Sequence, residues 1–179
     1  MSKSAVFLLV VLLGISACGP SAVLPDSGSS VSSRTGDDKN FAPELTPETA
    51  LSVLEAYFNA LNAGSYLEAA RIFGGDSTPL LEFNPEIPQD DQEALFASAC
   101  QTNGYLCDLQ LGEILQSNRV SDLALQFTVT LNQPDGSPFE LGPCCGDEQI
   151  SVSPLREFVY TIAWQDGLFQ VLELPVYNP

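Results

Sequence analysis

The stretch Ala56-Tyr57-Phe58-Asn59-Ala60-Leu61-Asn62-Ala63-Gly64-Ser65-Tyr66 decides how the rest of the chain folds. Its first half closes a helix that begins at Thr46, a good capping residue, and Pro47 and Glu48 suit the first turn of that helix. Its second half breaks the helix at Asn62-Ala63-Gly64. The apolar residues of the helix recur at helical spacing and form one stripe: Leu51, Leu54, Tyr57, Phe58 and Leu61. The helix therefore has one face to bury against another layer.

Two further helices are predicted after this break. A short one covers residues 66–73 and ends at Gly74-Gly75. The next runs from about residue 89 to residue 101, with acidic residues in its first turn. Residues 78–88, between these two helices, are rich in proline and are predicted to be a connection that carries an apolar patch.

From residue 106 onward the apolar period changes to two, which indicates strands. Strands are predicted over residues 106–115, 122–132, 139–141, 156–165 and 168–174. The clearest has one apolar face, made by Leu123, Leu125, Phe127, Val129 and Leu131. Asp166-Gly167 is a two-residue hairpin turn. Three helices followed by antiparallel strands are typical of an α+β domain.

The helical start also resembles a known family. Residues 56–66, followed by Glu68-Ala69-Ala70 and Phe73, are similar to the opening of nuclear transport factor 2-like (SnoaL-like) domains. That opening is an aromatic-rich helix, an Asn-Ala-Gly-Asp break and an alanine-rich helix that ends in Phe; here Ser65 replaces the acidic residue. The resemblance implies that residues 46–179 form one domain, with three N-terminal helices packed on a curved antiparallel sheet of four to six strands. In this family the sheet is cone-shaped and encloses a pocket.

The first 17 residues are predicted to be a lipoprotein signal peptide. Lys3 precedes an apolar run over residues 5–13, which is shorter than the roughly 20 residues that span a bilayer. The run leads into Ile15-Ser16-Ala17-Cys18, which resembles the lipobox of bacterial lipoproteins. In that family the cysteine is lipidated and becomes the first mature residue. An ordinary secretory signal is the alternative, and Ile15 fits its cleavage site poorly.

The lipobox resemblance implies a location and a partner. The protein would lie in the cell envelope, on the extracytoplasmic side of a bacterial membrane, and the acylated Cys18 would hold it in the lipid bilayer. Residues 18–45 would be the lipidated cysteine and a disordered tether, because this stretch is rich in Ser, Gly and Pro and has few large apolar residues.

Composition narrows the function classes further. The chain has 23 Asp and Glu against six Lys and Arg, for a formal net charge of −17, so its surface repels nucleic acid. There is no histidine, which removes the commonest general base and the commonest metal ligand. No Asp-x-Asp-x-Asp-Gly calcium loop is present either. We expect no metal site, no cofactor, no nucleic-acid partner and no enzymatic activity.

Four cysteines remain besides Cys18, and an exported chain with an even number suggests two disulfides. They are Cys100, Cys107, Cys144 and Cys145. Adjacent cysteines close only a strained ring, so we expect Cys100 and Cys107 to bond to Cys144 and Cys145, in either arrangement. A four-thiolate zinc site is the rival interpretation, but the spacing differs from paired C-x2-C knuckles.

The last hairpin supplies the candidate pocket residues. Its predicted register sets Trp164 opposite Phe169, Ile162 opposite Val171 and Tyr160 opposite Glu173, on a face that also carries Phe158. If that face lines the cone, Glu173 is a carboxylate on an apolar wall beside a phenol. Burial would then raise its pKa, so that it could act as a base. A position near the strand end, in water, is the alternative.

Three functions are compatible with these features. The leading expectation is a non-catalytic domain that binds a small molecule or a protein. The second is a pocket enzyme, a hydrolase or isomerase that uses Glu173 and Tyr160, and the third is a structural envelope component. Polar groups in a closed apolar cavity favour the enzyme, whereas a cavity filled by side chains favours the third.

The second face of the hairpin is also apolar. A homodimer through the sheet, common in the family, or residues 142–154 would cover it.

Overall fold

The first helix begins at the residue that the sequence marks as its cap. In the computed structural model, which describes residues 44–142 and 153–178, the hydroxyl of Thr46 accepts the amide of Thr49 at 3.2 Å. Pro47 follows in the first turn of helix α1 (Pro47–Asn62), as predicted. Leu45, which the sequence assigns to the tether, is buried and only 1% exposed. The packed part of the chain therefore begins one residue before the predicted boundary. Cys18 and the rest of the signal and tether to residue 43 lie outside the described residues.

Three shorter helices follow α1: α2 (Tyr66–Ile72), α3 (Thr78–Phe83) and α4 (Gln92–Gln101). Helix α3 lies where the sequence predicts only a connection. The prediction of three helices before the sheet is therefore wrong, because the described residues contain four. Its end is held by Asn84, the buried polar side chain of the described residues. Asn84 donates to the carbonyl of Leu80 at 2.7 Å, and its own amide oxygen accepts from Asn103 at 3.0 Å and from Ser98. These bonds join α3 to α4 and its C-terminal turn, a long-range interaction that local sequence patterns do not reveal.

Helix α4 begins three residues later than predicted. The carboxylate of Asp91 accepts the amide of Ala94 at 3.1 Å, so Asp91 is the cap rather than a residue of the first turn. The carboxylate satisfies an amide that has no partner within the helix, and its charge also suits the positive helix end.

Four strands form one antiparallel sheet in sequence order: β1 (Gln110–Ser121), β2 (Ala124–Asn132), β3 (Phe158–Gln165) and β4 (Leu168–Val171). The first strand begins later than predicted, and the last is shorter than predicted, because its ladder ends at Val171. Residues 139–141 form no strand of this sheet. They are held by the amide of Phe139, which donates to the carbonyl of Leu131, and by an isolated bridge from Leu141 to Leu155.

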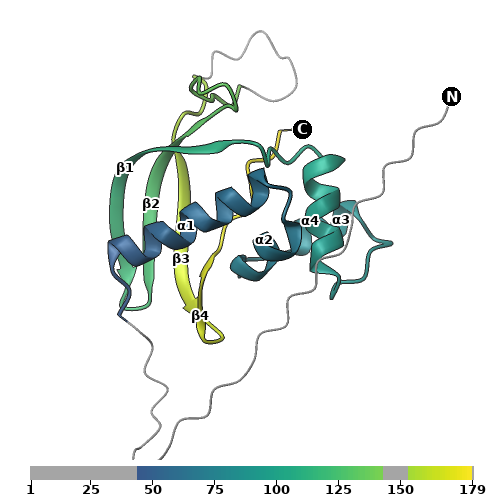
Figure 1. Cartoon of the computed structure of the whole chain (residues 1–179), viewed down its shortest axis with the longest axis horizontal. Helices are drawn as coiled ribbons and strands as arrows, with labels where there is room; N and C mark the ends of the chain where they lie inside the picture. Colours follow the sequence, from purple (N-terminus) through teal and green to yellow (C-terminus); the bar gives the residue numbers. More distant parts are fainter. Residues whose placement is uncertain (1–43, 143–152, 179) are drawn as a thin grey trace, which may run out of the picture. The chain divides into compact units, whose positions relative to one another are not determined.

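The core lies between α1 and the inner face of the sheet (Figure 1). Strand β2 alternates as predicted, with Leu125, Phe127, Val129 and Leu131 buried. Leu123 departs from the pattern, since it lies in the β1–β2 turn and is 42% exposed. From α1, the buried side chains on the core side are Leu54, Tyr57, Phe58 and Leu61. Burial of such side chains supplies roughly 1.5–3 kcal/mol each, so this contact fixes α1 against the sheet.

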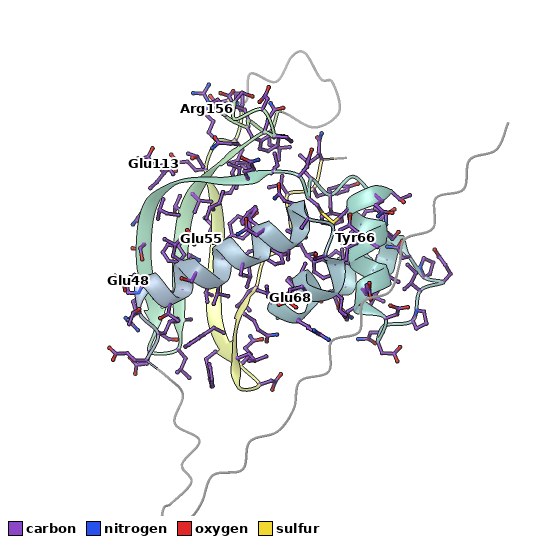
Figure 2. All side chains as sticks on the ribbon, viewed as in Figure 1. Glu48, Glu55, Tyr66, Glu68, Glu113 and Arg156 are labelled. Atoms are coloured by element: carbon purple, nitrogen blue, oxygen red, sulfur yellow. A yellow bond between two sulfur atoms is a disulfide. The ribbon has the colours of Figure 1, made fainter. Side chains whose placement is uncertain are left out.

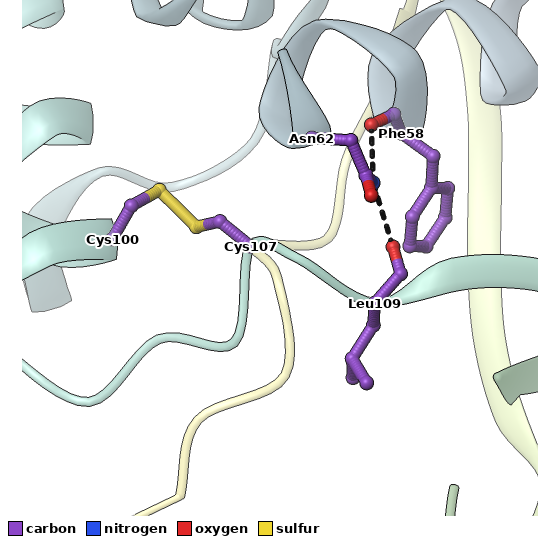
Figure 3. The surroundings of a disulfide bond; sticks show 5 residues. All are labelled: Phe58, Asn62, Cys100, Cys107 and Leu109. Carbon is purple, nitrogen blue, oxygen red and sulfur yellow. Dashed lines mark hydrogen bonds between the residues drawn. A yellow bond between two sulfur atoms is a disulfide. The ribbon is translucent and has the colours of Figure 1, made fainter. Parts of the chain in front are cut away.

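The cysteines close a different disulfide from the one predicted. Cys100 at the end of α4 is bonded to Cys107, with their Cα atoms 5.4 Å apart (Figure 3). Between them the chain reverses at Gly104, whose φ of +79° is one that glycine adopts readily. The reversal brings Cys107 back beside α4, within reach of a partner only seven residues away. The predicted bonds to Cys144 and Cys145 are therefore wrong for Cys100 and Cys107. Cys144 and Cys145 themselves lie outside the described residues.

The two edges of the sheet differ. Strand β4 is covered by the end of α2: Phe73 bridges to Val171, and the amide of Gly74 donates to the carbonyl of Val171 at 2.9 Å. The approach is so close that a Cβ on Gly75 would stand 1.9 Å from the carbonyl oxygen of Leu172. Strand β1 forms the opposite edge, and within the described residues no segment pairs with its outer side. Residues 115–121 of β1 are exposed on both faces.

Candidate functional site

The predicted hairpin register is confirmed as far as the ladder extends. Trp164 pairs with Phe169 and Ile162 with Val171. Strand β4 ends at Val171. The amide of Leu172 still donates to the carbonyl of Thr161, and the carboxylate of Glu173 accepts the amide of Thr161. Glu173 therefore does not pair with Tyr160 across a ladder, although it lies next to the same strand and is half-buried. Its carboxylate replaces a backbone carbonyl as the acceptor for Thr161.

The other candidate pocket residues come together as core packing. Tyr160 is 2% exposed and Ile162 is fully buried, and the ring of Phe58 from α1 meets that of Tyr160 edge-on at 5.2 Å. Phe158 is also buried and packs on Phe139. Trp164, at the turn end of the hairpin, is half-buried, and its ring centroid lies 4.8 Å from that of Phe169. Side chains therefore fill the inner face of β3 against α1, and this face is part of the core.

Tyr57 is the residue of this cluster that sequence reasoning missed. The helical stripe predicted it as an apolar packing residue, and its ring does pack edge-on against Phe58. Its hydroxyl, however, is buried and has no hydrogen-bond partner among the described protein groups. Tyr57 is the one stripe residue with a polar atom, and this was the available signal, because a buried phenol normally finds a hydrogen-bond partner.

Burial is the largest cause of the pKa shifts of Tyr57, Tyr160 and Glu173. It raises the pKa of Tyr57 well above its usual value, and the negative charges that Tyr160 and Glu173 can carry raise it further. Burial also raises the pKa of Tyr160, with the Glu173 carboxylate as the second cause. The pKa of Glu173 is raised by burial and partly restored by the amide of Thr161. Both phenols therefore remain protonated in the physiological range, and Glu173 holds its proton to a higher pH than a free carboxyl.

A groove of about 500 Å³ lies on the surface between α1 and β1. Its lining is mixed. The apolar lining residues are Leu51, Phe58, Leu111 and Ile114, and the polar ones are Glu55, Asn59, Asn62 and Gln110. Figure 2 shows Glu48 and Glu55 on the same helix, α1, with Glu113 on β1. A surface hollow that combines apolar side chains with hydrogen-bonding and charged groups has the composition of a binding surface.

Side-chain hydrogen bonds hold α1 to β1 near both ends of this groove. Asn62 donates to the carbonyl of Leu109, just before β1, and to that of Phe58, both at 2.8 Å (Figure 3). Near the other end, the guanidinium of Arg119 in β1 donates to the carbonyl of Leu45 at 2.8 Å. These bonds therefore fix the helix and the edge strand relative to each other.

Two further hollows open on the surface. One, of about 740 Å³, lies beside the disulfide and is lined by residues of the stretches 61–66 and 100–108. The other, of about 390 Å³, lies against the β1–β2 ladder near the ion pair of Arg156 and Glu140, whose charged atoms are 2.8 Å apart. Across residues 44–142 and 153–178 no group of three acidic or cysteine side chains could hold a metal ion. In the same residues no helix combines the length and the apolar character needed to cross a membrane.

No family model matches the chain, and no curated protein sequence matches it. Among solved structures, the chain is similar to an uncharacterised cystatin-fold protein from Novosphingobium aromaticivorans, with 13% sequence identity and a TM-score of 0.36. The match covers 69% of this chain and 95% of that one.

Proposed function

We propose that this chain is a membrane-tethered extracytoplasmic lipoprotein whose domain binds a protein partner in the groove between α1 and β1, without catalysis. The observation that carries the proposal is the contrast between the two sides of α1. Its core side meets a sheet face filled by Tyr160, Ile162 and other buried side chains. Its other side borders a groove lined by apolar and polar side chains, and hydrogen bonds hold α1 to β1 near both ends of this groove. A filled interior leaves the surface as the place for recognition, and this favours a protein over a small molecule.

The proposed domain is a cone of the nuclear transport factor 2-like kind. The support is the order of elements, with the helices before an antiparallel sheet, and the strands that bend around α1 (Figure 1). The Asn-Ala-Gly break after α1 adds the sequence resemblance. In such a domain a second copy could also bind across the sheet. Here the outer sheet face exposes Val159 and Leu168, which a homodimer would cover.

The tether is tested by labelling cells with palmitate. We expect the wild-type chain to be labelled and to sediment with membranes, and Cys18→Ala to lose both properties. Ser21→Ala, three residues further on, is the matched control and should behave as wild type. Label retained by Cys18→Ala would contradict the anchor.

A pocket enzyme that uses Glu173 and Tyr160 is the second candidate, and two observations favour it. The unpartnered hydroxyl of Tyr57 and the raised pKa of Glu173 are the kind of perturbation found at catalytic groups. The test is hydrolysis of small activated esters by the full chain. Turnover that is lost in Glu173→Gln but kept in Glu157→Gln would replace the non-catalytic proposal, whereas equal background rates in all three proteins would remove the enzyme.

A further inference from the structure

We propose that the partner is an extended, basic polypeptide segment that pairs with the open edge of β1 and lays every second side chain into the α1–β1 groove. This inference rests on the proposed function and adds the conformation and the charge of the partner. Three independent features of the described residues support it: the free edge of β1, the apolar residues that line the groove beside this edge, and the carboxylates of α1 that have no ion-pair partner.

The edge offers hydrogen-bonding groups in a regular array. Strand β1 is 12 residues long and lies at the end of the sheet order, so alternate amides and carbonyls point away from β2. Irregular register near Ile114 and before Ser121 interrupts the strand, but Gln116–Arg119 pairs without a shift. That stretch is exposed on both faces, which leaves room for another strand. Addition of a peptide strand to a sheet edge is an established recognition mode in proteins.

The apolar lining residues fit an extended chain. In a strand, successive side chains point to opposite faces, and alternate ones are about 6.5–7 Å apart. Where a docked segment continues from residues 116–119 past residues 110–114, one row of its side chains would therefore face Leu51, Leu111 and Ile114, which are apolar, partly exposed and line the groove. The second row would face water. A groove of about 500 Å³ accommodates a few aliphatic side chains and is too small for a second folded layer.

The charge selects a basic segment. Glu55 lines the groove and Glu48 lies two turns earlier on α1, and among the described residues neither has a cation within ion-pair distance. Of the three arginines of the described residues, Arg71 and Arg156 are ion-paired with Glu68 and Glu140, and Arg119 donates to the carbonyl of Leu45 and keeps its charge; none of the three lies within ion-pair distance of Glu48 or Glu55. With a net charge of −17, the chain would attract a cationic segment and repel an acidic one.

The test uses the full chain in detergent micelles and three synthetic decapeptides. The probe is an acetylated, amidated (Lys-Val)₅ peptide. The first comparison peptide is (Glu-Val)₅, and the second is (Lys-Val)₅ with every second backbone nitrogen methylated, which keeps the charge but removes donors from the ladder. We expect (Lys-Val)₅ to bind, to slow amide exchange in β1, and to bind at least tenfold tighter than either comparison peptide. Glu55→Gln should weaken its binding about threefold at low salt, as one exposed ion pair allows. Glu93→Gln, on α4 away from the groove, should leave it unchanged.

The possible outcomes separate this inference from the function on which it rests. If all three peptides bind equally and protect β1, the groove is an interaction site but the basic strand is wrong. If no peptide protects the groove, both are wrong. Protection of β1 without any peptide, with a doubled mass in sedimentation, would mean that a second copy of the chain occupies the edge, and it would also overturn the inference.

Discussion

The two edges of the sheet, β1 and β4, lie in different surroundings. At β4, the end of α2 bonds to the strand and Gln170 donates to the carbonyls of Arg71 and Phe73, so the edge is satisfied within the domain. At β1, α1 runs beside the strand and is joined to it near the ends, which leaves the middle of the edge free. Proteins commonly shorten or cover edge strands because free edges recruit other chains. The short covered edge is therefore a structural device, and the long open one is the place where a function can be expected.

The largest expected effect comes from removing the cover of β4. Phe73 is 7% exposed and meets Phe96 edge-on at 5.4 Å, so Phe73→Ala should destabilise the domain by about 3–5 kcal/mol. Val120 on the open edge is 59% exposed, and Val120→Ala should change stability by no more than about 0.5 kcal/mol. Urea unfolding followed by circular dichroism measures both. Similar losses in the two variants would show that the edges are not different in kind.

The disulfide sharpens the comparison on the open side, because Cys107 lies just before β1. A loop with a sequence separation of seven residues should contribute about 2.5 kcal/mol in the chain-entropy model. We expect Cys100→Ala/Cys107→Ala to lose about that much and to speed amide exchange near Leu109 more than at Gly74. Non-reducing peptide mapping provides the control. A wild-type peptide that links Cys100 to residue 144 or 145 would contradict the pairing.

Substitution of Tyr57 tests whether its buried hydroxyl lacks a hydrogen-bond partner, as the structure shows for the described residues. Its hydroxyl is buried without a protein partner, and a buried unsatisfied group costs about 1–3 kcal/mol. Tyr57→Phe should therefore keep or raise stability, by up to about 1 kcal/mol. Tyr66→Phe, at a half-buried position, should be neutral. A loss above about 1 kcal/mol in Tyr57→Phe would mean that the hydroxyl has a partner, such as a bound water or ligand.

The smallest expected effect is that of Glu173→Gln, and it depends on pH. The pKa of Glu173 in the folded chain lies above the ordinary 4.5, so the folded state holds the proton more tightly than the unfolded state. Stability contributed by this group is present below pH 4.5 and decreases as the pH rises through the folded pKa. Gln keeps an acceptor for Thr161 and carries no charge. With solvent screening of a half-exposed group, we expect equal stability at about pH 4 and a gain of up to about 0.5 kcal/mol at about pH 8. A variant that is less stable at the higher pH would reverse the sign of the argument.

Local patterns predicted much of this fold. The cap at Thr46, the stripe of α1, the alternation of β2 and the Asp166-Gly167 turn all depend on residues close in sequence, and all are confirmed. The α+β arrangement follows from their order. These features were predictable because each is stabilised by contacts of short sequence range or by a simple period.

The errors arose where distant contacts decide the outcome. Helix α3 depends on the bonds of Asn84 to Ser98 and Asn103, and the disulfide depends on a reversal at Gly104 that the sequence did not place in three dimensions. Glu173 was expected in a ladder and instead bonds through its side chain. The groove was not predicted at all, because its lining residues come from two elements far apart in the sequence and are ordinary surface residues in each. For the open edge beside the groove a signal was available, because residues 116–119 of β1 are polar on both faces.

Amide hydrogen exchange of the full chain without any added partner tests the central claim most directly. If β1 is an open edge and β4 a covered one, exchange should alternate along residues 116–119, where the pairing with β2 is regular, with every second amide fast, while the amide of Gly74, bonded to Val171, should be protected. Uniform protection of residues 116–119, or rapid exchange at Gly74, would contradict this account of the two edges.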